Sequence, residues 1–86
     1  MKLPNYFSVA IYEHNYKQVE QFLLDNDYYW YGTKKERFDI TKSSLFNNFS
    51  CSYIIMKKEL SWLPYISMNS YSGDYLLRKL KFLKLI

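Results

Sequence analysis

The sequence has little of what most small-protein chemistry requires. Its 86 residues include one cysteine, one histidine, two glycines and two prolines. A single cysteine cannot form a disulfide within the chain, which favours a reducing compartment. One histidine and one cysteine do not make a zinc ligand set, and two glycines do not make a phosphate-binding loop. We therefore expect no metal, no cofactor and no enzymatic activity.

The two scarce reactive residues also lack the neighbours that catalysis needs. His14 precedes a predicted helix, and no motif places a nucleophile or an orienting group beside it. Cys51 opens an apolar segment, where a buried thiol usually serves packing. We interpret His14 as a surface residue and Cys51 as a core residue, so the sequence predicts no catalytic residue.

Long apolar runs are absent as well. No stretch approaches the roughly 18 apolar residues of a membrane span, and the first five residues lack the apolar core of a secretory signal. Apolar residues make up 49% of the chain and charged residues 23%, which is typical of a folded protein. The length predicts a single domain over residues 1–86, and we expect it in the cytoplasm without membrane contact.

Aromatic residues, in contrast, are abundant: ten tyrosines, six phenylalanines and two tryptophans. Four of them are consecutive, at residues 28–31. Tyrosine is enriched where proteins meet proteins and where bases stack, although an AT-rich coding genome would also raise its frequency. Because a strand alternates its faces, we assign Tyr28 and Trp30 to the core. Tyr29 and Tyr31 then become candidate contacts for a partner.

The net charge of +4 lies entirely in the last twelve residues. That segment has four basic residues and no acidic one: Arg78, Lys79, Lys81 and Lys84. Such a segment suits contact with phosphates, but it also suits a helix with solvated lysines or a helix on a membrane surface. Lys34, Lys35 and Arg37 form a second basic stretch, either a solvated loop or part of one basic face with the C-terminus.

Periodicity predicts the fold. We expect strands at 6–12, 28–31, 51–56 and 60–66, a helix at 15–26, one helical turn at 43–48, a loop at 70–73, and a last helix from 74 with a strand as the alternative over 79–86. Asn15 and Gln18 predict a capping box, and Asn26 a left-handed helix end. The fold class is α+β, a small mainly antiparallel sheet of three to four strands with one helix packed on a face and a basic C-terminal helix or strand.

The predicted helix over 15–26 is amphipathic. Val19, Phe22 and Leu23 share the face that we expect to pack on the sheet, whereas Glu20 falls among the solvated positions. Alternation in the first strand places Val9 with its odd-numbered neighbours toward this helix. These residues are the predicted core.

The helix end and the aromatic strand together resemble a motif of small accessory proteins of T-even-like phages. The matching residues are the cluster at 22–24 and the run at 28–32, within a resemblance that covers about residues 6–32. The usual form has glycine where this chain has Asp27. The resemblance implies a protein that binds and disables host machinery or defence systems, and it transfers no active site.

Length, basic charge and aromatic content are also similar to those of TifA-like antagonists of the ToxN toxin of ToxIN systems, which are associated with RNA. The resemblance implies a host or defence protein as partner, with an RNA–protein complex as one form of it. We therefore expect a non-enzymatic inhibitor with RNA contact through Tyr29, Tyr31 and the two basic stretches. The alternatives are a general single-stranded nucleic-acid-binding protein and a structural subunit that forms homo-oligomers.

Overall fold

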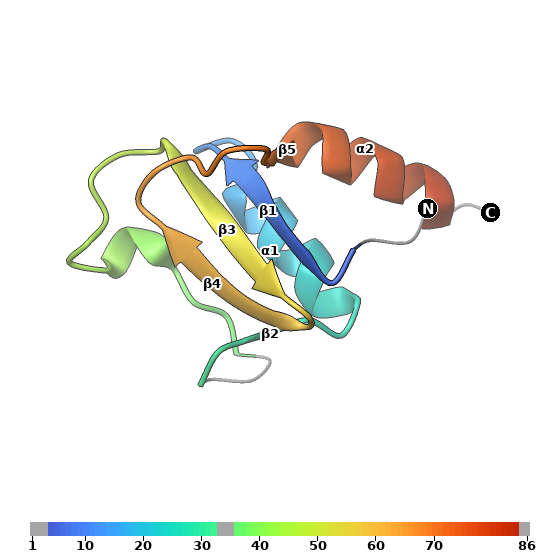
Figure 1. The fold of residues 1–86 in the computed structure, drawn as a ribbon, viewed down its shortest axis with the longest axis horizontal. Helices are drawn as coiled ribbons and strands as arrows, with labels where there is room; N and C mark the ends of the chain where they lie inside the picture. Colours follow the sequence, from blue (N-terminus) through green and yellow to red (C-terminus); the bar gives the residue numbers. More distant parts are fainter. Residues whose placement is uncertain (1–3, 33–35, 85–86) are drawn as a thin grey trace.

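A computed structural model describes residues 4–32 and 36–84 of the chain, and the side chains of the last helix as far as residue 78. In chain order the elements are β1 (Tyr6–Ile11), α1 (Tyr16–Asp25), β2 (Tyr29–Trp30), the short 3-10 helix η1 (Ile40–Lys42), β3 (Cys51–Met56), β4 (Glu59–Leu63), β5 (Tyr71–Ser72) and α2 (Gly73–Lys84). Figure 1 shows the strands as one layer, with α1 behind it and α2 at its upper edge.

The five strands form one sheet in the order β2-β4-β3-β1-β5. β3 is antiparallel to β1 and β4, whereas β2 is parallel to β4 and β5 is parallel to β1. The α+β class is therefore confirmed. The two long pairings are antiparallel as expected, but the sheet has five strands instead of three to four and is mixed, because β2 and β5 each add a two-residue parallel pair. The helical crossover through α1 brings β2 back in the direction of β1, which a short hairpin could not do.

The core lies between the sheet and α1. Alternate residues of β1, β3 and β4 point to this side, and α1 supplies Val19 and Leu23, both fully buried. Trp30 and Tyr53 meet edge to face at 5.5 Å between ring centroids. Phe22, which we expected in the core, is only partly buried beside it, because it lies at the margin of the face centred on Val19 and Leu23.

Glu20 is the largest departure from the expected helix pattern. The sequence places it among solvated positions, but its side chain is buried. One carboxylate oxygen accepts from the Trp30 indole N–H (2.8 Å) and from the backbone N–H of Phe38 (2.8 Å). The other accepts from Arg37 Nε at 3.0 Å. These three donors replace the hydrogen bonds to water that the carboxylate loses when it is buried.

The predicted capping of α1 is wrong at both ends. The Asn15 side chain makes no cap to α1. Its Oδ1 accepts from the Tyr12 backbone N–H (2.7 Å), and its Nδ2 donates to Asp74 of α2 (3.0 Å). The left-handed residue after the helix is Asp27, at φ 68°, and not Asn26 at φ −104°. Asn15 therefore holds α2 instead of capping α1, and Asp27 adopts the left-handed conformation that the sequence pattern assigned to Asn26.

Three further boundaries differ from expectation. The helical turn lies at 40–42 instead of 43–48. At its start the Asp39 carboxylate accepts a hydrogen bond from the Thr41 backbone N–H (3.0 Å). β4 ends at Leu63, because Pro64 has no N–H to donate to the sheet. The expected loop over 70–73 contains β5 and the first residue of α2, and α2 continues to Lys84, so the strand alternative for 79–86 is wrong over its described part.

Candidate binding surface

The side of the sheet opposite α1 is only partly covered. The chain between β4 and β5 crosses one end of it, where Ser52 donates to the Tyr65 carbonyl (2.8 Å) and Ser8 bonds to Ser70 (2.8 Å between hydroxyl oxygens). The other end, around the β3–β4 hairpin, has no such cover among the described residues. It is the front surface in Figure 1, where β3 and β4 lie before α1.

Strand register places four side chains in one row across this uncovered end. Tyr6 pairs with Met56, Met56 with Glu59, and Glu59 with Tyr29. Directly paired residues point to the same face of a sheet. The row therefore crosses β1, β3, β4 and β2, and its outer members lie roughly 14 Å apart, three strand spacings.

A second row follows two residues along each strand, with Ile54 paired to Ser61. Tyr31 extends this row at the β2 edge, since its backbone N–H still bonds to the Leu60 carbonyl (3.0 Å) and it alternates with Trp30. We call the seven uncovered residues of the two rows the open face: Tyr6, Tyr29, Tyr31, Ile54, Met56, Glu59 and Ser61.

The open face exposes three large side chains, those of Tyr6 and Met56 on strands and that of Tyr31 in the turn after β2. Tyr31 is 76% exposed, Tyr6 62% and Met56 53%, whereas Tyr28 and Trp30 are buried on the other side. The inward orientation predicted for Tyr28 and Trp30 and the exposure predicted for Tyr31 are therefore confirmed, whereas Tyr29 is half-buried. Large exposed apolar side chains that share one face of a sheet are a feature of interaction sites.

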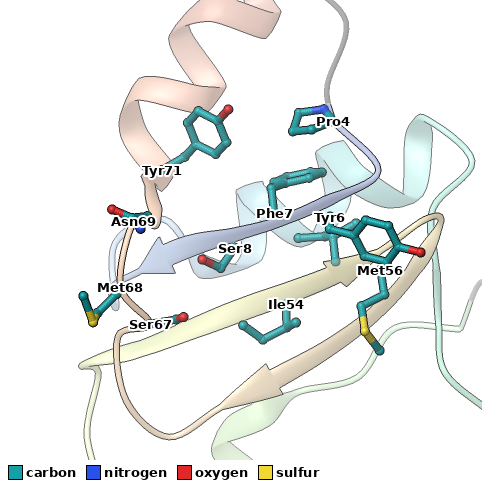
Figure 2. Close-up of a pocket in the computed structure, with 11 residues that line it drawn as sticks. Pro4, Tyr6, Phe7, Ser8, Ile54, Met56, Ser67, Met68, Asn69 and Tyr71 are labelled. Carbon is teal, nitrogen blue, oxygen red and sulfur yellow. The ribbon is translucent and has the colours of Figure 1, made fainter.

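A shallow pocket of about 440 Å³ opens at the β1 side of the open face. Figure 2 shows Tyr6 and Met56 beside each other at one end of it and Met68 at the other. Ile54 lies in the floor, and Phe7 and Tyr71 stand at the β1 edge, with their rings 5.9 Å apart between centroids. β1, β3 and the segment before β5 thus build the pocket together.

The pocket carries no charged side chain among its eleven lining residues. On the open face itself the one ionisable carboxylate is Glu59. Lys58, although it belongs to the adjacent hairpin, turns to the other side, where its Nζ lies 4.2 Å from the Tyr28 ring centroid and donates to the Asn26 carbonyl. The surface is therefore aromatic and apolar, with little charge.

Of the two predicted basic stretches, the described side chains are those of Arg37 and Arg78, and neither belongs to the open face. β2 and β5, from which the two stretches continue, lie at opposite edges of the sheet. Arg37 bonds to Glu20, Gln21 and the Lys17 carbonyl, so its guanidinium serves the fold. Arg78 is exposed on α2. Lys34 and Lys35 and the side chains of Lys79, Lys81 and Lys84 lie outside the described residues.

Sequence reasoning missed Tyr6, Met56 and Met68 as surface candidates. Alternation in 6–11 and 51–56 could have identified Tyr6 and Met56, because it places them on the face of their strands that points away from the core. Met68 is 88% exposed in an irregular segment, where no periodicity applies.

The titratable groups elsewhere form structural contacts. His14 Nε2 lies 2.8 Å from Asp74 Oδ2, and the hydrogen bonds from His14 and Asn15 lower the pKa of Asp74. Burial raises the pKa of the Cys51 thiol, which donates to the Asn48 carbonyl and so is a poor nucleophile. In the described part of the chain no three acidic, histidine or cysteine side chains converge as metal ligands.

Comparisons with protein families, with curated protein sequences and with solved structures gave no match to this chain. Neither helix, over the residues described, combines the length and hydrophobicity that crossing a membrane requires. The open face and its pocket are therefore the features on which a functional proposal rests.

Proposed function

We propose that this protein is a non-enzymatic inhibitor that binds a host or defence protein through its open face. The proposal extends the expectation of a phage accessory protein that acts in the host cytoplasm. The observation that carries it is the pair of side-chain rows, which present to solvent Tyr6 and Met56 on paired strands and Tyr31 in the turn after β2. The sheet fixes the backbone that carries Tyr6 and Met56, so a partner that covers these side chains does not have to order that backbone.

The composition of the open face favours a protein over a nucleic acid. Tyrosine and methionine are enriched in protein interfaces, and charged residues are depleted at interface centres. Phosphate backbones require basic side chains, and the seven residues of the open face include the carboxylate of Glu59 but no lysine or arginine.

Single-stranded RNA is a second candidate, favoured by one observation. Tyr6, Tyr29 and Tyr31 share one face of a sheet, and such rings can each stack on a base. In this case the basic stretches at Lys34–Lys35 and Arg78–Lys84 would supply the phosphate contacts, as the sequence predicts.

The test compares the wild-type protein with the double variant Tyr29→Ser and Tyr31→Ser. The partner is identified by co-purification from host cells, purified, and titrated against both proteins by calorimetry. Interface tyrosines commonly contribute 1 kcal/mol or more each, so we expect the double variant to bind at least about tenfold more weakly. The variant Tyr12→Ser with Leu45→Ser removes two exposed apolar side chains elsewhere and should bind normally.

Nuclease treatment separates the two candidates. A protein complex should survive it, and the absorbance ratio at 260 and 280 nm should stay that of protein. Loss of the complex, or a nucleic-acid spectrum that disappears with nuclease, supports RNA instead. Full partner binding by a folded open-face double variant contradicts both candidates.

A further inference from the structure

We infer that the pocket beside β1 receives an uncharged, apolar side chain from an extended segment of the protein partner, and that this segment pairs with the free edge of β1. The inference rests on the proposed function, because it names the part of the partner that one end of the open face recognises. It depends on a strand edge, a pocket and a fixed turn that lie next to each other.

The strand edge comes first. β1 spans Tyr6–Ile11, but β5 pairs with it only at Val9 and Ala10. Within the described residues no strand pairs with the outer edge of β1 at 6–8. Successive residues of a strand point their N–H and C=O groups to alternate edges, and the described residues form no backbone hydrogen bond to the outward groups of this stretch. An added strand can bond to such an edge.

The pocket lies where such a segment would place a side chain. Tyr6 and Ser8 line it from β1 itself, Pro4 lines it from the residues just before β1, and Tyr71 lines it from β5, which ends the pairing. Figure 2 shows these residues around one hollow, with Ile54 below. Main-chain bonds to an edge supply affinity, and a pocket for an alternate side chain supplies specificity.

A fixed turn forms the far wall. Ser70 Oγ donates to the Ser67 carbonyl (2.6 Å), which leaves the Ser8 hydroxyl to donate to Ser70 (2.8 Å). These bonds tie the turn to β1. Asn69, at φ 62°, reverses the chain there, and Met68 stands 88% exposed at the rim. Methionine adapts its shape to apolar partners.

The lining selects the occupant by charge. None of the eleven residues is ionised, so a carboxylate or ammonium entering the pocket would lose water without gaining a counter-ion. Ser67 and Asn69 offer polar groups at the rim, which suit the amides of a peptide backbone. An apolar side chain on an extended, uncharged peptide fits both conditions.

The test uses three blocked tripeptides as probes: N-acetyl-Thr-Phe-Thr-amide and its Glu and Lys counterparts at the central position. The protein carries ¹³C-methyl methionine and ¹⁵N labels, so the Met56 and Met68 methyl signals report on the pocket and the Phe7 and Ser8 amides on the edge. We expect the Phe peptide to shift both sets with about millimolar affinity. The charged peptides should shift neither set. A Phe peptide that is N-methylated at its amides should lose most of the effect.

Substitution at the rim supplies the matched control. Met68→Lys should abolish the Met56 methyl shift, Met68→Leu should retain it, and Leu45→Lys, which adds the same charge at a remote exposed site, should leave it intact. Equal binding of the charged peptides overturns the inference, as does an unchanged shift in Met68→Lys. Equal binding of toluene would indicate a small-molecule site, and stronger shifts with oligouridine would indicate nucleic acid, so either result also overturns it.

This experiment can fail separately from the proposed function. If the Phe peptide does not bind while partner affinity still depends on Tyr29 and Tyr31, the pocket inference is wrong and the open face remains the binding surface. If the peptide binds and those tyrosines are dispensable, the edge and pocket form a site of their own, and the open-face proposal is wrong.

Discussion

The two faces of the sheet use aromatic residues in opposite ways: one face buries them in the core and the other exposes them to solvent. On the helix side, Trp30 and Tyr53 are buried and their polar atoms are bonded, the indole to Glu20 and the phenol to the Tyr16 carbonyl at 3.1 Å. On the open side, Tyr6 and Tyr31 extend into solvent. Whether a tyrosine or tryptophan belongs to the core or to a surface is therefore decided by whether its hydroxyl or indole N–H bonds to another protein group.

The two faces also differ in how many polar side-chain atoms they bury. Among the described residues, no buried side-chain nitrogen or oxygen lacks a hydrogen-bond partner. The helix side reaches this state by burying a carboxylate with three donors around it. The open face has few buried hydrogen-bonding groups, so a substitution there should not leave a buried donor or acceptor without a partner. The fold should depend on one face, and binding on the other.

The strongest test of this comparison is a pair of truncations, Leu23→Ala and Met56→Ala. Leu23 is fully buried against the sheet, so its truncation should cost about 2–5 kcal/mol through lost transfer energy and a cavity. Met56 is half exposed on the open face, and its truncation should stay within about 1 kcal/mol. Urea unfolding followed by circular dichroism measures both values. Similar costs for the two variants would show that the open face is part of the core.

The sequence predicts the regular parts of this comparison well. Alternation in 6–11 and 51–56 and the helical period of 16–25 identify β1, β3 and α1. These elements are long enough for periodicity to be read. Alternation over 28–31 also predicts β2 and assigns Trp30 inward, whereas the two-residue strand β5 is too short for periodicity. The partners of β2 and β5, which are β4 and β1, are distant in sequence. Sheet order is therefore a property of tertiary packing.

The candidate site was only half predictable for the same reason. Tyr29 and Tyr31 follow from alternation alone, but their union with Tyr6 and Met56 requires the strand order. Glu20 was misplaced because its burial depends on Trp30 and Arg37, which come from a different part of the chain. Helical periodicity contains no information on such a partner.

The next effect in size concerns the buried carboxylate. Glu20→Ala should destabilise the protein by about 2–3 kcal/mol, because it strands the buried Trp30 indole N–H and the Phe38 N–H. Glu20→Gln retains an acceptor and should recover part of the loss. Gln21→Ala, on the exposed side of the same helix, should change stability by less than about 1 kcal/mol. Equilibrium unfolding decides this, and a Glu20→Ala variant as stable as Gln21→Ala would show that the carboxylate is not needed in the core.

The smallest effect is a loss of stability in acid that acts on the helix side alone. Hydrogen bonds lower the pKa of Asp74, chiefly from His14, and that of Asp39, chiefly from the Thr41 hydroxyl. A carboxyl whose pKa is lower in the folded state stabilises that state above its ordinary value of 3.8. This contribution disappears as the pH falls from that value through the lowered one.

Asp74 joins α2 to the residues before α1, so its protonation should loosen the helices first. We expect urea stability to decline below about pH 4 in the wild type, and the decline to be shallower in Asp74→Asn, which has no proton to gain. Asp25→Asn makes the same chemical change at the exposed end of α1 and serves as the control for altered charge. The Met56 methyl signal, a reporter of the open face, should keep its position over the first part of the acid decline. Its movement together with the loss of helical signal would mean that the two faces unfold as one unit.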